Sequence, residues 1–233
     1  MDFSLTEEQQ AIREMVARFA QQEIAPRVGE YDREERFPVE IYEKMGPLGL
    51  TGGVIPEEYG GAGMDHVTYA LVIMELARHC QALAASATWA SGVTGASLLR
   101  YGSEELKRMY LVPLAQGKGP VAIALTETHT GSDVASMRLR VTRKGDGYVL
   151  NGTKTWVSMI RSCKWILTFG TLDPNLGHRG ICAFVVEPQW AGVQASPFKH
   201  KVGFRPMETG EMAFENVFVP AGNLVGKEGE GFR

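Results

Sequence analysis

The spacing of apolar residues along the chain changes from a helical period to a strand period. In the first half, apolar residues recur every three or four positions, as on one face of an amphipathic helix. Thr6-Glu7-Glu8-Gln9 is a capping box, which predicts a helix that begins there and ends by Pro26 and Gly29. From Val121 onward, apolar and polar residues alternate in short runs. The pattern therefore predicts a helical region followed by a β-region.

More helices are predicted in the first half by their caps. Pro38 suits the first turn of a second helix, while Asp65 and Ser103 are N-cap residues for a third and a later short one. Residues 50–63 are rich in glycine and predict a loop. Gln81–Leu99 carries no charge over 19 residues, which is long enough to span a bilayer. Because most of those residues are small, we expect a central helix of a helical bundle and no membrane span.

The second half predicts an antiparallel β-domain, a closed barrel or a sandwich. Lys144-Gly145-Asp146-Gly147 is a hairpin signal, and Asn151-Gly152 predicts a second tight turn. The predicted strands are 121–125, 137–142, 148–150, 155–157, 165–169, 181–186, 193–196 and 212–219. The fold class is therefore α+β, with an all-α domain before a barrel-like or sandwich-like β-domain. We place the α-domain at 1–118 and the β-domain at 119–228, and we interpret 229–233 as the start of a truncated third domain.

Composition narrows the function classes. Hydrophobic residues make up 44% and charged residues 22% of the chain, which are globular values, and the net charge of -3 argues against a nucleic-acid surface. The clustered Arg138, Arg140, Arg143 and Lys144 are interpreted as a solvated strand face. The three cysteines have no disulfide or zinc-ligand spacing, so we expect no metal site and a reducing compartment. The N-terminus lacks the pattern of a signal peptide.

Two segments carry candidate chemistry. The apolar run that ends at Leu125 opens into Thr126–Asp133, which is dense in hydroxyls, and such a strand end suits phosphate or the polar edge of a ring. Trp156-Val157-Ser158 could pack against a ring and bond its edge, or could equally be a core tryptophan beside a turn-capping serine. Dinucleotide, P-loop, nucleophile-elbow and zinc-protease motifs are absent from the sequence.

Six short motifs occur in a specific order from one end of the chain to the other. They are Asp2–Gln9, Ile55–Gly61, Leu125–Asp133, Leu150–Ser158, Phe214–Pro220 and Gly229–Phe232. Together they resemble the acyl-CoA dehydrogenase flavoprotein family, over all 233 residues. The resemblance implies FAD as the cofactor and the α,β-dehydrogenation of an acyl-CoA thioester to the 2-enoyl-CoA. It also implies electron transfer to an electron-transferring flavoprotein, and a homotetramer.

The resemblance assigns the polar strand end to the cofactor and the substrate. Leu125 and Thr126 would contact the flavin ring, and Gly131 and Ser132 would lie beside the FAD pyrophosphate. Ser132 would also reach the pantetheine chain of the acyl-CoA. His129 stands where the family usually has a small residue, and we expect it to lie near the cofactor or acyl pocket and to influence substrate choice.

The resemblance assigns the second segment to the flavin alone. Trp156 would pack beside the isoalloxazine, with Val157 next to it, and the Ser158 hydroxyl would lie near flavin N5. Ser158 replaces a common threonine and keeps its hydroxyl. The family's catalytic glutamate lies in its C-terminal helical domain, so we assign no catalytic residue here, and Glu127 is not taken for the base.

Two other functions stay open at this point. An acyl-CoA oxidase, in which the reduced flavin meets O₂, would share these motifs. A non-catalytic subunit that binds flavin or acyl-CoA would share them too. We expect the bacterial cytoplasm, or else the mitochondrial matrix after processing.

Overall fold

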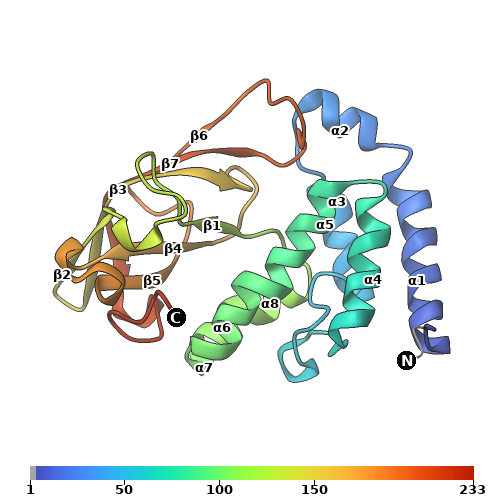
Figure 1. Cartoon of the computed structure of the whole chain (residues 1–233), viewed down its shortest axis with the longest axis horizontal. Coiled ribbons are helices and arrows are strands. Elements are labelled where there is room, and N and C mark those ends of the chain that lie inside the picture. Colours follow the sequence, from blue (N-terminus) through green and yellow to red (C-terminus); the bar gives the residue numbers. More distant parts are fainter. Residues whose placement is uncertain (1–3) are drawn as a thin grey trace. The chain divides into compact units, whose positions relative to one another are not determined.

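Helices come first along the chain and strands second, in the computed structural model that describes residues 4–233 (Figure 1). This confirms the predicted order and the α+β class. The first two residues of the motif Asp2–Gln9 lie outside the described residues. The α-helices are α1 (Glu7–Phe19), α2 (Val28–Glu34), α3 (Val39–Met45), α4 (His66–Ala77), α5 (Gln81–Thr88), α6 (Gly95–Tyr101), α7 (Glu104–Leu106) and α8 (Val112–Ala115).

Several short non-α turns extend or connect these helices. The π-helical turns are η1 (Ala20–Ile24), η4 (Trp89–Thr94) and η5 (Lys107–Leu111). The 3₁₀ turns of this region are η2 (Gly46–Leu48) and η3 (Glu57–Tyr59), the second within the predicted loop. Helix α2 was not predicted, because Gly29 was interpreted as a stop and lies inside it.

The predicted caps are present. The Thr6 hydroxyl accepts a hydrogen bond from the Gln9 backbone N–H, and the Gln9 side chain accepts one from the Thr6 N–H, each at 3.1 Å. The Asp65 carboxylate caps α4 by accepting from the N–H groups of Val67 and Thr68. These bonds satisfy N–H groups that would otherwise lack partners at the helix ends. Helix α1 then packs on α4, and α4 on α5.

The uncharged segment Gln81–Leu99 is helical, through α5, η4 and the start of α6. Its small residues pack inward: Ala82, Ala84, Ala87 and Ala90 are all buried. Of the helices within residues 4–233, none has the length and apolar content that crossing a bilayer requires.

The strands form one eight-stranded sheet. They are β1 (Ala122–Ala124), β2 (Arg140–Lys144), β3 (Gly147–Ser158), β4 (Ile166–Thr171), β5 (Ile181–Val186), β6 (Val193–Pro197), β7 (Thr209–Pro220) and β8 (Leu224–Val225). Their order is β6-β7-β3-β2-β4-β5-β8, and β1 pairs with β4 off this path. The predicted hairpin is present, with Lys144 paired to Gly147. Strands β4 and β5 are buried along most of their length.

The sheet differs from the predicted antiparallel barrel or sandwich in two ways. It is open, and β4 pairs in parallel with both β1 and β2. Hairpin signals report only on strands that follow each other directly, so they could not reveal that β1 lies beside β4. The turn predicted at Asn151-Gly152 is also wrong, because β3 runs through it. A register shift and the positive φ of Gly152 (147°) absorb the irregularity instead.

The described chain packs as two units, neither of which is one continuous stretch. The helical unit comprises residues 4–96, Val112–Gly119 and His200–Met207. The sheet unit comprises Ser97–Leu111, Pro120–Lys199 and Glu208–Arg233. The boundaries proposed from the sequence stay predictions.

Ion pairing explains why the segment between β6 and β7 belongs to the helical unit. The Arg205 guanidinium lies 3.0 Å from the Glu35 carboxylate, and its Nε donates to the Asp32 carbonyl. The His200 N–H also donates to the Glu35 carboxylate, at 3.1 Å. Residues 200–207 are therefore tied to the C-terminal end of α2.

Close packing around the glycine-rich loop gives a stability prediction. A Cβ added at Gly61 would lie 2.0 Å from the Ile55 carbonyl oxygen, so the backbone would have to shift. We expect Gly61→Ala to lower the free energy of unfolding by about 2 kcal/mol or more, measured by denaturant titration. Gly92→Ala is the matched control, because nothing lies within 4 Å of the added carbon and little change is expected. Equal effects in both variants would contradict the packing argument.

Candidate functional site

The polar strand end forms a tight loop beside β3. After β1 the chain continues next to β3, where the Thr155 N–H donates to the Thr126 carbonyl at 2.8 Å. Glu127 and Thr130 then exchange two backbone hydrogen bonds, of 3.0 and 3.2 Å. The chain therefore reverses at Thr128-His129. Both residues at this tip are exposed.

Glu127 is a structural residue of this loop. Its carboxylate accepts hydrogen bonds from the N–H groups of Arg138 (2.7 Å) and Leu139 (2.8 Å) and from Lys154 Nζ (2.8 Å). His129 Nε2 lies 3.4 Å from the second carboxylate oxygen. With these partners both oxygens of the carboxylate are engaged as hydrogen-bond acceptors inside the protein.

Burial and pairing act in opposite directions on the Glu127 carboxyl. Burial raises its pKa, but the hydrogen bond and charge of Lys154 and the N–H groups of Leu139 and Arg138 outweigh burial and hold the pKa below the ordinary 4.5. Burial lowers the pKa of the Lys154 ammonium, and Glu127 offsets part of that effect. The side chains of Lys154 and Glu127 are 0% and 3% exposed. They form a buried ion pair.

The distal part of the loop is open to solvent. Gly131, Ser132 and Asp133 are exposed, and no atom lies within 4 Å of a Cβ built on Gly131. The Asp133 carbonyl accepts a hydrogen bond from the Thr130 hydroxyl, and the Asp133 carboxylate accepts one from the Ser136 hydroxyl. Both hydrogen bonds lie within the loop and stabilise its conformation. The solvent-exposed backbone at Gly131 and the exposed Ser132 hydroxyl together form a surface to which a phosphate or a polar chain could bind.

Trp156 is a surface residue and not a core tryptophan, so its packing against a ligand ring stays the prediction for this segment. It is 64% exposed, and its φ of 58° lies in the left-handed region that a tryptophan rarely adopts. The register shift between Lys154 and Val157 places it there. Its ring meets Phe198 edge-on, with centroids 5.1 Å apart. Backbone strain of this kind clusters at active sites and ligand-binding segments.

The neighbours of Trp156 on β3 face differently. Val157 is fully buried and pairs with Gly210 of β7, so it presents no exposed surface to a ligand. Ser158 is half-buried and belongs to β3, where it pairs with Thr209, so it does not cap a turn.

Two buried charged residues near these segments were missed by sequence reasoning. Lys154 lies within the motif Leu150–Ser158. A single lysine among otherwise uncharged strand residues is a sequence signal for a buried charge. Glu208 is 7% exposed and accepts a hydrogen bond from the Ser162 hydroxyl at 2.7 Å. No sequence pattern marks Glu208.

The predicted site residues all lie in the sheet unit. The Thr155–Thr126 hydrogen bond brings the first segment beside the second, and Glu127 ties the loop of Gly131 and Ser132 to the same strand. An exposed flat ring, half-exposed Leu125 and Thr126, and an open hydroxyl-bearing loop fit a ligand that combines an aromatic ring with phosphate. FAD has this combination.

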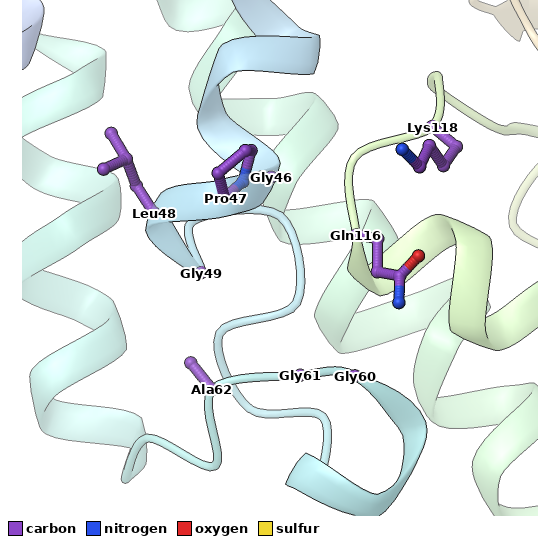
Figure 2. Close-up of a pocket in the computed structure, with 9 residues that line it drawn as sticks. All are labelled: Gly46, Pro47, Leu48, Gly49, Gly60, Gly61, Ala62, Gln116 and Lys118. Carbon is purple, nitrogen blue, oxygen red and sulfur yellow. The ribbon is translucent and has the colours of Figure 1, made fainter.

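The helical unit contains a separate cavity of about 550 Å³ (Figure 2). Glycine backbone forms much of its wall, and Leu48 and Lys118 lie at its sides. Lys118 is the charged residue among those that line it. The residues predicted from the sequence to bind the cofactor or substrate do not line this cavity.

Comparison with known proteins identifies the family. The model of the acyl-CoA dehydrogenase N-terminal domain matches residues 6–118, and the model of the middle domain of the same family matches residues 122–217. The short-chain-specific acyl-CoA dehydrogenase of Clostridium acetobutylicum is 37% identical over 100% of this chain and 61% of its own length. The chain belongs to the acyl-CoA dehydrogenase family, whose members are flavoprotein oxidoreductases.

Solved structures agree. A structure described as electron transferring flavoprotein of Acidaminococcus fermentans matches with a TM-score of 0.95 and 36% identity, over 100% of this chain and 61% of that one. A glutaryl-CoA dehydrogenase from Mycobacterium smegmatis, described as a complex with FADH2, matches with a TM-score of 0.89 and 30% identity, over 96% of this chain and 57% of that one. The chain spans about three fifths of the length of the curated relatives it matches.

The buried ion pair gives a pH prediction. Because the pKa of Glu127 is lower in the folded protein, the pair stabilises fully above the unfolded value of 4.5, and that stabilisation is lost as the pH falls through the folded pKa. We expect the free energy of unfolding to fall as the pH drops from 6 toward 3, and to fall less steeply in Glu127→Gln. Chemical denaturation at several pH values measures both.

The same variant has a second expected effect, at neutral pH. Removing one partner of a buried pair costs about 3 kcal/mol or more. Glu23→Gln, which breaks the exposed Lys44–Glu23 pair, is the control and should cost under about 1 kcal/mol. Identical pH profiles for the native protein and Glu127→Gln would contradict the assignment.

Proposed function

We propose that the protein is an FAD-dependent acyl-CoA dehydrogenase that oxidises an acyl-CoA thioester to the 2-enoyl-CoA. The match to both family domains supports this proposal most directly. The exposed, left-handed Trp156 beside the open loop of Gly131 and Ser132 supports it independently. The substrate of the similar Clostridium enzyme is described as short-chain, so we take a short acyl-CoA as the first substrate to test.

Four of the predicted site residues serve the flavin ring in this proposal. FAD, when bound, supplies the two-electron acceptor for the substrate's Cα–Cβ bond. Trp156 offers an aromatic surface to the flavin, and the backbone of Leu125 and Thr126 offers hydrogen-bonding groups to the edge of the ring. Ser158 supplies a hydroxyl beside this surface. These groups orient the cofactor and exclude water from it.

The exposed loop serves the polar parts of cofactor and substrate in this proposal. Gly131 leaves the backbone open, so a phosphate could approach its N–H closely. The Ser132 hydroxyl is exposed and could bond the FAD pyrophosphate or the pantetheine chain of the substrate. Among the described residues we assign no catalytic base, and the Glu127 carboxylate is committed to Lys154 and to backbone N–H groups.

The proposal extends to partners. We propose an electron-transferring flavoprotein as the electron acceptor, in keeping with the description of the Acidaminococcus structure. We also propose a homotetramer as the assembly, on the family resemblance. An oxidase would instead pass electrons to O₂.

The proposed activity is tested on the protein that is expressed from its natural gene and then purified. We expect a bound flavin, seen by its visible absorbance, that loses this absorbance when butyryl-CoA is added without oxygen. Reoxidation by an electron-transferring flavoprotein, without release of peroxide, identifies a dehydrogenase. Peroxide release in air would instead identify an oxidase. A bound flavin that acyl-CoA never reduces would identify a binding subunit and overturn the proposal.

His129 gives a prediction about substrate choice. Its half-exposed ring lies at the loop tip, and Glu127 holds one edge of that ring. We expect His129→Ala to change the ratio of kcat/KM between short and long acyl-CoA substrates by about threefold or more, since losing a polar contact costs about 1 kcal/mol. Thr128→Ala, at the neighbouring exposed position, is the control and should leave the ratio unchanged. An unchanged ratio in both variants would refute the role of His129.

A further inference from the structure

The buried Lys154 connects three parts of the candidate site. Its Nζ donates to the Leu125 carbonyl and to the Glu127 carboxylate, each at 2.8 Å, and lies 3.9 Å from Met137 Sδ. Leu125 and Glu127 flank Thr126, whose carbonyl is bound by the N–H of Thr155. One ammonium group therefore holds the Leu125 carbonyl and the Glu127 side chain, on either side of the predicted flavin contact Thr126.

Glu127 extends this connection to the far end of the loop. Its carboxylate accepts from the N–H groups of Arg138 and Leu139, which directly precede β2. The loop of residues 128–137, which includes Gly131 and Ser132, therefore starts and ends beside the Glu127 carboxylate. The pair thus closes the base of the loop and attaches it to β3, two residues before Trp156.

Stability alone gives no reason to keep a charged pair at this position. Removing two charges from water costs several kcal/mol, and apolar residues of similar volume often serve as well or better. The particular value of this pair is geometric: an ammonium and a carboxylate together bind a carbonyl and two N–H groups that apolar side chains would leave without partners.

We infer that Lys154 and Glu127 are positioning residues of the flavin site, which hold the loop 128–137 and the backbone of Leu125–Glu127 in the conformation that receives FAD. This inference rests on the proposed function. Lys154 and Glu127 act through the backbone groups they bind, and neither is assigned a contact with FAD.

Two variants separate positioning from simple stabilisation. Lys154→Met removes the tether and leaves Glu127 as a buried charge without its cation. Lys154→Met combined with Glu127→Gln also removes the tether, but it leaves no buried charge. Arg143→Met, which breaks the exposed Arg143–Glu228 pair at the end of β2, is the matched control.

The readouts are the Kd of FAD for the deflavinated full-length protein, the visible absorbance and circular dichroism of bound FAD, and Tm. We expect Lys154→Met to weaken FAD binding on the order of tenfold or more, to change the visible spectrum and to lower Tm. The double variant should recover part of the Tm and none of the FAD affinity. Arg143→Met should match the native protein in FAD affinity and spectrum.

Other outcomes would overturn the inference. If the double variant regains affinity together with Tm, the pair is only stabilising. If FAD affinity and spectrum are unchanged in both variants, the pair does not position the site.

Hydrogen exchange tests the loop without the cofactor. We expect Lys154→Met to speed exchange at the amides of residues 128–137 while the amides of β4 and β5 keep their protection. Unchanged exchange in the loop would contradict the tether itself. A native protein that binds no FAD would refute the proposed function and the flavin role with it, and the exchange experiment would then report on the tether alone.

Discussion

The buried pair of Lys154 and Glu127 is the constraint on which the candidate site depends. Lys154, on β3, binds the carbonyl of Leu125, the residue that follows β1, and the next loop begins and ends at Glu127. The residue after β1, the base of the loop and β3 are thereby held by a few hydrogen bonds in a place that excludes water. In such surroundings each bond is strong and each missing partner is costly, which favours one conformation over its alternatives.

The same strand that anchors the pair also presents the exposed tryptophan. A register shift just beyond Lys154 turns Trp156 outward, while Val157 returns to the core. The buried anchor, Lys154, and the exposed ring, Trp156, therefore lie two residues apart on β3. A rigid, buried lysine gives the strained backbone next to it a fixed base, and strained residues persist only where their surroundings over-determine them.

The sequence predicts the fold more fully where the signals are local. The capping box at Thr6, the N-cap at Asp65 and the hairpin at Lys144–Gly147 depend on neighbouring residues, and the structure has all three. The parallel pairing of β1 with β4 depends on long-range contacts and was missed. Within the site, the motifs located the loop and the tryptophan. The uncharged neighbours of Lys154 mark that residue locally. Its pairing with Glu127 and the burial of Glu208 emerge only when separate segments are brought together, so no local pattern could reveal them.

The segment between β6 and β7 affects how the protein could be divided into separate fragments. The helical unit includes residues 200–207, whose Arg205 pairs with Glu35 near the end of α2, and Ser97–Leu111 belongs to the sheet unit although it precedes the strands. The chain crosses between units several times, so no single cut yields both. A helical fragment that ends near residue 119 would lose Arg205, the cation that pairs with Glu35. A sheet fragment that begins there would lack Ser97–Leu111, the helical residues that pack with the sheet unit. Modular exchange with relatives would have to transfer these crossing segments together.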